Sequence, residues 1–119
     1  MARRRRKVDL IQPYTRLSDE EVQALWSAYA TTPSVEIRNR LAEHYLPIVK
    51  YTSERLHTKL PDEVDINDLY QDGFQGLLDA IASYDLGRGV KFETFCAARI
   101  RGAILDSLRE KDWEIGRAS

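Results

Sequence analysis

The chain has 119 residues, of which 43% are hydrophobic and 31% are charged, a balance typical of a soluble folded protein and not of a disordered one. No apolar run approaches the roughly 18 residues that a membrane span needs, and the basic stretch 3–7 is not followed by the apolar segment of a secretory signal. The single cysteine, Cys96, excludes an internal disulfide, so we expect a cytoplasmic protein in which Cys96 is a small core residue.

The first elements in chain order are an arm and a short helix. Residues 1–16 lack helical periodicity and include Pro13, so we expect a basic, flexible N-terminal arm. Ser18 and Glu21 have the spacing of a capping box, which predicts that a helix begins after Ser18. Pro33 predicts its end.

A second helix is predicted over about 35–60, because apolar residues recur there at steps of three and four. Pro47 lies inside this pattern. An interior proline removes one hydrogen bond and clashes with the preceding turn, at about 3 kcal/mol. We therefore expect either a kink near 43–46 or a break into two helices.

A third helix is predicted from its N-cap at Asp65 to about Ser83, and a fourth over about 92–111. The glycines of the turn at 85–89 suit positive φ, and the short turn makes the two helices antiparallel neighbours or a steeply angled pair. The residues of the third helix expected to face inward are Ile66, Leu69, Tyr70, Phe74, Leu77, Leu78 and Ile81. The predicted fold is all-α, a compact bundle of about four to five helices with a kinked second helix.

The net charge of −1 conceals a segregation of charge along the chain. Residues 61–87 contain seven acids and no lysine or arginine, whereas residues 88–111 contain six basic residues and three acids. Adjacent blocks of opposite charge are consistent with two partners of opposite charge. Charge alone leaves open the alternative of two ordinary solvated helix faces.

No catalytic or metal-binding pattern is visible. His44 and His57 lie far apart and neither has a metal-ligand spacing, so we expect both to be surface or partly packed helix residues. The sequence also lacks a nucleophile motif and a glycine loop that follows a strand. We therefore predict that the protein is not an enzyme and has no cofactor and no metal.

Two stretches have residue types that are unusual for an ordinary helix pair. Gly73 and Gly76 lie inside the third helix, where each costs about 1 kcal/mol relative to alanine, so another backbone or helix should approach closely there. That backbone could belong to a partner or to a crossing helix of this chain.

The second stretch combines Phe92 and Phe95 with nearby cations. Aromatic faces can stack unpaired bases while lysine and arginine neutralise phosphates. The alternative is that both phenylalanines are core residues and the cations are solvated.

In this order, the two stretches resemble region 2 of the sigma-70 family of initiation factors, in particular its flagellar and sporulation-type members. The matching positions are Asp68-Leu69, Gln71, Gly73, Gly76-Leu77-Leu78, Ala80, Tyr84-Asp85, Phe92, Thr94-Phe95, Arg99-Ile100-Arg101-Gly102-Ala103, Asp106, Leu108-Arg109 and Asp112-Trp113. Residues 39–49, with Pro47, are similar to the opening helix of that region. The resemblance implies a region 2-like domain over 17–113, followed by a tail at 114–119.

The resemblance implies two binding partners and no membrane. The first is core RNA polymerase, whose largest subunit would offer a coiled coil to Asp68, Leu69, Tyr70, Gln71, Asp72 and Gln75. The second is promoter DNA, whose opened non-template strand at the −10 element would lie along Lys91, Phe92, Thr94, Phe95, Arg99, Arg101 and Trp113.

The chain departs from the family pattern in two respects. Ala98-Arg99 stands where housekeeping members of the family have a tryptophan pair. The flagellar-type members that this chain resembles also lack that pair. The chain also ends six residues after Trp113, before the domain that reads the −35 element in this family. An isolated domain, a truncated product and a natural single-domain variant all remain open. The alternative function is a non-initiating protein that occupies the sigma site on the polymerase or binds an anti-sigma factor.

Overall fold

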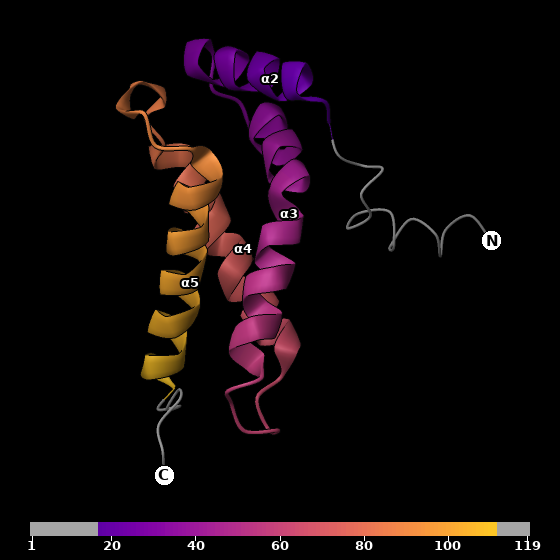
Figure 1. The fold of residues 1–119 in the computed structure, drawn as a ribbon, viewed down its shortest axis with the longest axis vertical. Coiled ribbons are helices and arrows are strands. Elements are labelled where there is room, and N and C mark those ends of the chain that lie inside the picture. The colour runs from indigo at the N-terminus through magenta and orange to yellow at the C-terminus, as the bar shows by residue number, and fades with distance from the viewer. Residues whose placement is uncertain (1–16, 112–119) are drawn as a thin grey trace, which may run out of the picture. The chain divides into compact units, whose positions relative to one another are not determined.

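The computed structural model describes residues 17–111, and all of its regular structure is helical (Figure 1). Its elements are α2 (Asp19–Thr31), α3 (Val35–His57), α4 (Ile66–Ser83), the short 3-10 helix η2 (Leu86–Arg88) and α5 (Phe92–Glu110). Four α-helices and no strand within 17–111 confirm the prediction of an all-α fold. The predicted arm at 1–16, Trp113 and the tail at 114–119 lie outside the described residues. None of the described helices has the length and apolarity that crossing a membrane requires.

The chain divides into two compact units, and the first ends at Pro47. The capping box predicted at its first helix is confirmed: Ser18 Oγ accepts a hydrogen bond from the Glu21 amide at 3.2 Å, and the Glu21 carboxylate accepts one from the Ser18 amide at 2.8 Å. Trp26 and Tyr45 are both buried, and the Trp26 indole N–H donates to the Tyr45 hydroxyl at 3.1 Å. This bond ties α2 to the N-terminal half of α3.

Helix α3 continues through Pro47 without interruption and ends at His57, three residues before the predicted end. The expectation of a break into two helices is therefore wrong, and the expectation of a kink remains a prediction. Proline removes one backbone hydrogen bond from the helix, and the hydrogen bonds before and after it can maintain the helical conformation.

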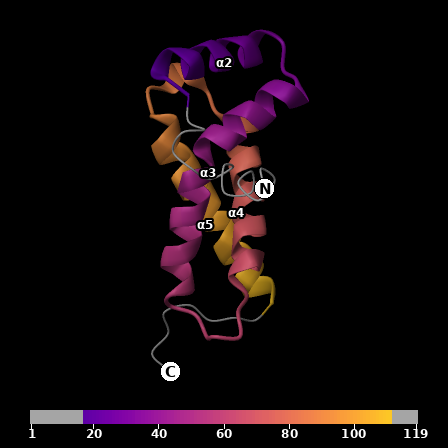
Figure 2. The same cartoon turned by 90° about the vertical axis from the view of Figure 1, so that its right-hand side faces the viewer.

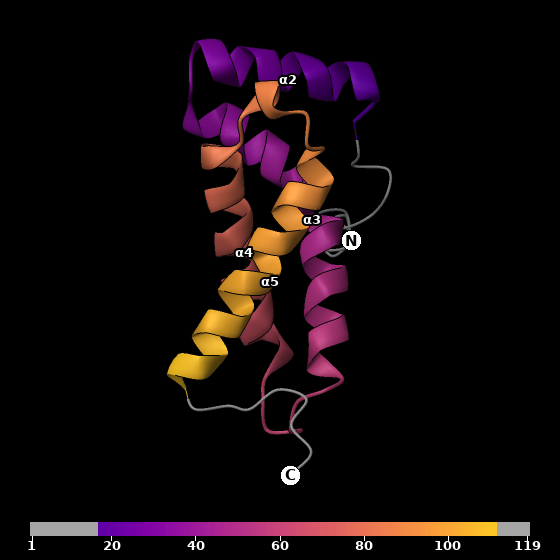
Figure 3. The same cartoon turned by 60° about the vertical axis from the view of Figure 1, so that its left-hand side comes forward.

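The second unit begins at Ile48 and is built around helices α4 and α5, which lie side by side and cross each other (Figure 3). Residues 58–65 connect α3 to α4 at the end of α4 opposite to η2 (Figure 2). The buried apolar residues of this unit are Val49, Leu56, Leu60, Val64, Leu69, Leu77, Ala80, Ile81, Phe92, Cys96, Ile100, Ile104 and Leu108.

The interior glycines of α4 are explained by this crossing. A Cβ on Gly76 would lie 2.8 Å from the Arg99 carbonyl oxygen and 2.9 Å from the Ala103 Cβ, closer than real contacts allow. A Cβ on Gly73 would lie 3.1 to 3.2 Å from methyl groups on α3 and α5. Of the two alternatives that the sequence left open, a crossing helix of the same chain therefore accounts for both positions.

The turn between α4 and α5 uses one left-handed glycine and not two. Asp85 caps η2 by accepting a hydrogen bond from the Gly87 amide at 2.9 Å. Gly89 follows with a φ of 84°, a conformation that favours glycine. Gly87 lies inside the 3-10 turn, so the expectation of positive φ is correct for Gly89 and wrong for Gly87.

One residue expected in the core of α4 lies on its surface. Phe74 is 36% exposed, whereas Leu69, Leu77 and Ile81 are buried as predicted. Successive residues of a helix are about 100° apart, so Phe74 is turned away from Gly73, the residue that faces the neighbouring helices. Helix α4 therefore carries an exposed aromatic ring among polar residues.

Candidate functional site

The exposed face of α4 is polar and acidic. Asp65 begins the helix by accepting a hydrogen bond from the Asn67 amide at 2.9 Å, and Asp68 follows in the first turn, where a carboxylate is favoured by the helix dipole. Of the residues predicted to dock on the polymerase, Asp68, Gln71 and Gln75 are exposed, Tyr70 and Asp72 are half-buried, and Leu69 is 1% exposed. Leu69 anchors α4 in the core, and its predicted role as a contact residue stays a prediction.

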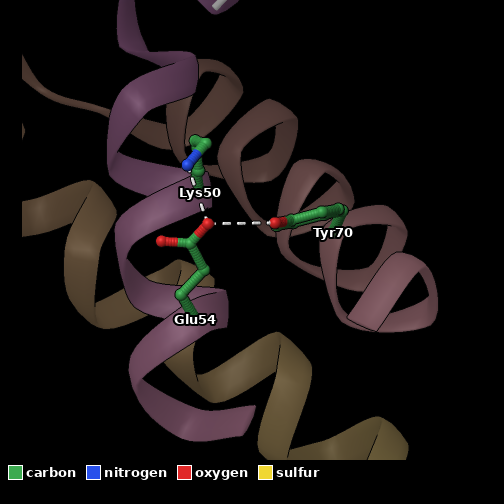
Figure 4. A network of polar contacts seen from close by, with 3 residues as sticks. All are labelled: Lys50, Glu54 and Tyr70. Carbon is green, nitrogen blue, oxygen red and sulfur yellow. Dashed lines mark hydrogen bonds and ion pairs between the residues drawn. The ribbon is translucent and has the colours of Figure 1, made fainter. Parts of the chain in front are cut away.

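The side chain of Tyr70 is held by a polar network that reaches from α4 to α3 (Figure 4). Glu54 accepts a hydrogen bond from the Tyr70 hydroxyl at 3.2 Å and from the Lys50 ammonium at 2.7 Å. The hydrogen bond from Lys50 lowers the pKa of the Glu54 carboxyl. The pKa of the Tyr70 hydroxyl is raised, mainly by its partial burial and to a smaller extent by the negative charge of Glu54. The network therefore fixes Tyr70 beside the exposed face while its hydroxyl is engaged within the chain.

Three aromatic rings meet where α5 begins. The ring centroids of Tyr84 and Phe92 are 5.0 Å apart, and those of Tyr84 and Phe95 are 5.5 Å apart. Phe92 is 4% exposed and Phe95 is half-buried, so Phe92 is a core residue and Phe95 lies at the edge of the surface. Because Phe92 is buried and Phe95 is not, Phe95 is the better placed of the two rings to touch a DNA strand, and the predicted contact of Phe92 stays a prediction.

Arg99 covers the outer side of this aromatic cluster. Its guanidinium lies 5.4 Å from the centroid of the Phe95 ring and donates to Ser83 Oγ at 2.7 Å. A small cavity of about 90 Å³ beside Phe95 is lined by Ser83, Tyr84, Asp85 and Val90. Tyr84 was not among the predicted site residues, although the pair Tyr84-Asp85 was part of the recognised motif. Its hydroxyl donates to the Val90 carbonyl and so braces the turn.

The other predicted strand-binding residues do not form one cluster. Thr94 is exposed on α5, and Lys91, the N-cap residue of that helix, is also exposed. Arg99 and Arg101 are two residues apart, which places them about 200° apart around the helix. Accordingly, Arg99 faces the end of α4, whereas Arg101 lines a cleft against the C-terminal half of α3. The sequence placed these two arginines on one surface, and the helix places them on opposite sides.

The cysteine and the two histidines of the chain are packed against its helices. Burial raises the pKa of the Cys96 thiol to about 12, with a further contribution from Glu93, so Cys96 is the core residue that we predicted. His44 accepts a hydrogen bond from the Leu17 amide, and His57 lies 2.8 Å from the Val64 carbonyl oxygen, so both are partly packed. Within 17–111, no three metal-ligating side chains come together.

Comparison with known proteins gives consistent matches. Residues 41–114 match the family model for sigma-70 region 2. The chain is 45% identical over 76 residues to the RNA polymerase sigma factor FliA of Yersinia enterocolitica, covering 64% of this chain and 33% of that protein. It is 42% identical over 83 residues to FliA of Escherichia coli K12, covering 70% of this chain and 35% of that protein. It is 39% identical over 93 residues to the RNA polymerase sigma-D factor of Bacillus subtilis, covering 78% of this chain and 37% of that protein. The chain thus spans about a third of the length of these relatives.

Proposed function

The chain belongs to the sigma-70 family through its region 2, and from this premise we propose that it binds core RNA polymerase through α4 and holds the opened non-template strand of the −10 promoter element on α5. The matches with FliA and sigma-D confirm the resemblance to flagellar-type members. Because sigma factors are initiation factors and not enzymes, the prediction that this chain is not an enzyme is also confirmed. A cytoplasmic location is part of the proposal.

The observation that carries the proposal is that the two candidate surfaces belong to one packed pair of helices. The exposed side chains of Asp68, Gln71 and Gln75 provide carboxylate and amide groups on α4. Such groups can bind the basic and polar side chains of a coiled coil, and charge complementarity would orient the encounter. The buried side of the same helix is fixed against α5 at Gly76.

Strand capture is supported by the combination of an aromatic edge with cations. Phe95 offers a half-buried ring beneath the Arg99 guanidinium, and Lys91 and Thr94 are exposed at the start of the same helix. Stacking of one unpaired base on an aromatic ring contributes roughly 1–3 kcal/mol, and each neutralised phosphate adds a salt-dependent term. A melted strand satisfies both requirements, whereas the bases of a duplex are already stacked on each other.

The docking part of the proposal is tested by capture of core polymerase on the immobilised 119-residue chain. Changing Asp68→Ala together with Gln71→Ala should reduce the captured polymerase by at least about tenfold. The matched control is Glu20→Ala with Gln23→Ala, an acid and an amide with the same spacing, both exposed on α2. Failure of the unchanged chain to capture polymerase, or an equal loss in both variants, would contradict docking through α4.

The strand-binding part is tested by fluorescence anisotropy with a single-stranded −10 non-template oligonucleotide. We expect tighter binding to this oligonucleotide than to its duplex, with an affinity that falls as salt rises. Equal affinity for an unrelated single strand would show that the binding is nonspecific electrostatic attraction and would contradict recognition of the −10 strand. Capture of polymerase without transcription from a −10-only promoter would favour the alternative of a protein that occupies the sigma site without initiating.

A further inference from the structure

A cleft between the C-terminal half of α3 and the middle of α5 is lined by basic side chains. It has a volume of about 180 Å³, and it is lined by Tyr51, Thr52, Arg55, Leu56, Lys59, Ala97 and Arg101. Three of these side chains carry a positive charge and none carries a negative charge. Only Arg101 was recognised from the sequence as a candidate binding residue.

The aromatic wall of the cleft is open to a ligand. Tyr51 is 60% exposed, an unusual exposure for a large ring in a helix that is otherwise packed on one face. The Arg55 guanidinium lies 5.5 Å from the centroid of this ring and donates to its hydroxyl at 2.9 Å. Arg55 is thus held in place by a neutral partner, and within residues 17–111 it forms no ion pair.

Among the residues that the structure describes, the other two cations of the cleft form no ion pair with a carboxylate. Within 17–111 the ion pairs join Lys50 to Glu54 and Arg109 to Asp106, and neither pair includes a residue of the cleft. The three charges line one hollow, where a bound anion would be attracted to all of them. The site combines the two features by which proteins hold single-stranded nucleic acid: a cationic groove and an exposed aromatic ring.

The charges on the two sides of α5 favour this cleft over its opposite flank. On the Arg99 side, α5 and α4 enclose a hollow that includes the carboxylates of Asp79 and Asp106, which repel phosphate. On the Arg101 side the hollow has no carboxylate. Thr94 and Ala98 are small exposed residues of α5, and Ala98 also lines the hollow on the Arg99 side.

We propose that this cleft binds a phosphodiester of single-stranded DNA, with Arg55, Lys59 and Arg101 as phosphate ligands and Tyr51 as a stacking surface for the adjacent base. The strand would leave Phe95, cross the small residues of α5 and enter the cleft against α3. The inference rests on the proposed function, because it extends the path of the strand bound at Phe95. It adds α3 to the DNA-binding surface.

The test measures binding of the −10 non-template oligonucleotide to the 119-residue chain by anisotropy over a range of salt concentrations. Arg55→Gln and Lys59→Gln should each weaken binding about two- to fivefold at low salt, and each should reduce the salt slope by about 0.7, the value for one single-strand phosphate. The matched control is Arg40→Gln, which removes the same charge from an exposed arginine of the same helix, outside the cleft. The control should change neither the affinity nor the slope by a comparable amount.

Variants of Tyr51 distinguish the contribution of base stacking to the affinity from that of charge. Tyr51→Ala should weaken binding at least about fivefold, whereas Tyr51→Phe keeps the ring and should stay within about twofold of the unchanged chain. A set of oligonucleotides, each with an abasic sugar at one position, should identify the stacked base. When that base is missing, Tyr51→Ala should no longer change the affinity. Thermal unfolding of each variant, followed by circular dichroism, verifies that the helices are intact.

The outcomes distinguish this cleft from the proposed function. If Phe95→Ala weakens strand binding while Arg55→Gln and Lys59→Gln match Arg40→Gln, the cleft is not part of the path and the proposed function stands. If the unchanged chain does not bind the single strand, both proposals fail. If inorganic phosphate displaces the bound labelled oligonucleotide at the same concentration as unlabelled oligonucleotide does, the cleft binds anions in general. That result would overturn the role of Tyr51.

Discussion

The substitution Gly76→Ala provides a quantitative test of the helix crossing, and Gly102→Ala provides its matched control. Both residues lie inside helices, where replacing glycine with alanine by itself stabilises a protein by about 0.4–1 kcal/mol. At Gly102 nothing lies within 4 Å of the added Cβ. The full helix-propensity gain should therefore be realised there, and the melting temperature should rise by a few degrees, at about 4–8 °C per kcal/mol.

At Gly76 the same gain is opposed by a clash with backbone. The added Cβ would lie 2.8 Å from the Arg99 carbonyl oxygen and 3.0 Å from the Ile100 Cα, and neither atom can move by a change of rotamer. Overpacking of this kind costs about 1–3 kcal/mol, so the net effect should be a loss of about 1–2 kcal/mol. At Gly73 the neighbours are methyl groups at 3.1 to 3.2 Å, so alanine there should have an intermediate effect.

The assay is urea unfolding followed by the helical circular dichroism signal, with the free energy of unfolding compared among the variants and the unchanged chain. The expected order of stability is Gly102→Ala, then the unchanged chain, then Gly76→Ala. A Gly76→Ala variant as stable as Gly102→Ala would show that α4 and α5 do not approach this closely in solution, and the packing argument for both interior glycines would be refuted.

Four further predictions concern the core and the cap of α2. The thiol of Cys96, with its pKa raised to about 12, should be alkylated only as the protein unfolds, and rapid labelling of the native protein would contradict its burial. Because the unfolded thiol has the ordinary pKa of 9.0 and loses its proton first, the stability should fall as the pH rises from about 9 to about 12, and Cys96→Ala should remove that part of the decline in urea titrations. Ser18→Ala should lower the free energy of unfolding by about 1 kcal/mol through loss of the α2 cap, and a Ser18/Glu21 double-mutant cycle should show coupling between the two residues. Tyr45→Phe, which removes the acceptor of the Trp26 indole N–H, should cost about 1 kcal/mol in the same assay, and an unchanged stability would show that this bond contributes nothing net.

The helices of the second unit were predictable because local signals agree with one another. Asp65 is both a good N-cap and the observed cap, and α4 ends at the predicted Ser83. The two interior glycines also carried information, since their cost implied a close approach. The sequence could not say which backbone approaches, because that depends on the crossing point of α4 and α5, a long-range property.

The candidate site was predictable as a set of residues and not as a surface. Leu69 and Phe92 belong to the recognised motif, yet both are core residues, because a motif records packing as well as binding. Arg99 and Arg101 are close in sequence and far apart around α5. The cleft residues Arg55 and Lys59 carried no local signal, because their meaning depends on the proximity of α3 to Arg101, which only the folded chain provides.

The contact at Gly76 has a mechanical consequence for the two helices. Where side chains separate two helices, rotation about side-chain bonds can absorb a small displacement of one helix before the other responds. At Gly76 the nearest atoms of α5 are the backbone of Arg99 and Ile100 and the short, rigid Cβ of Ala103, so no flexible side chain separates the helices. Close-packed interiors transmit strain, so a push on the exposed face of α4 reaches α5 at the residue that covers the Phe95 ring. A displacement of α4 at Gly76 should therefore be passed directly to α5, without first being absorbed by side-chain rotation.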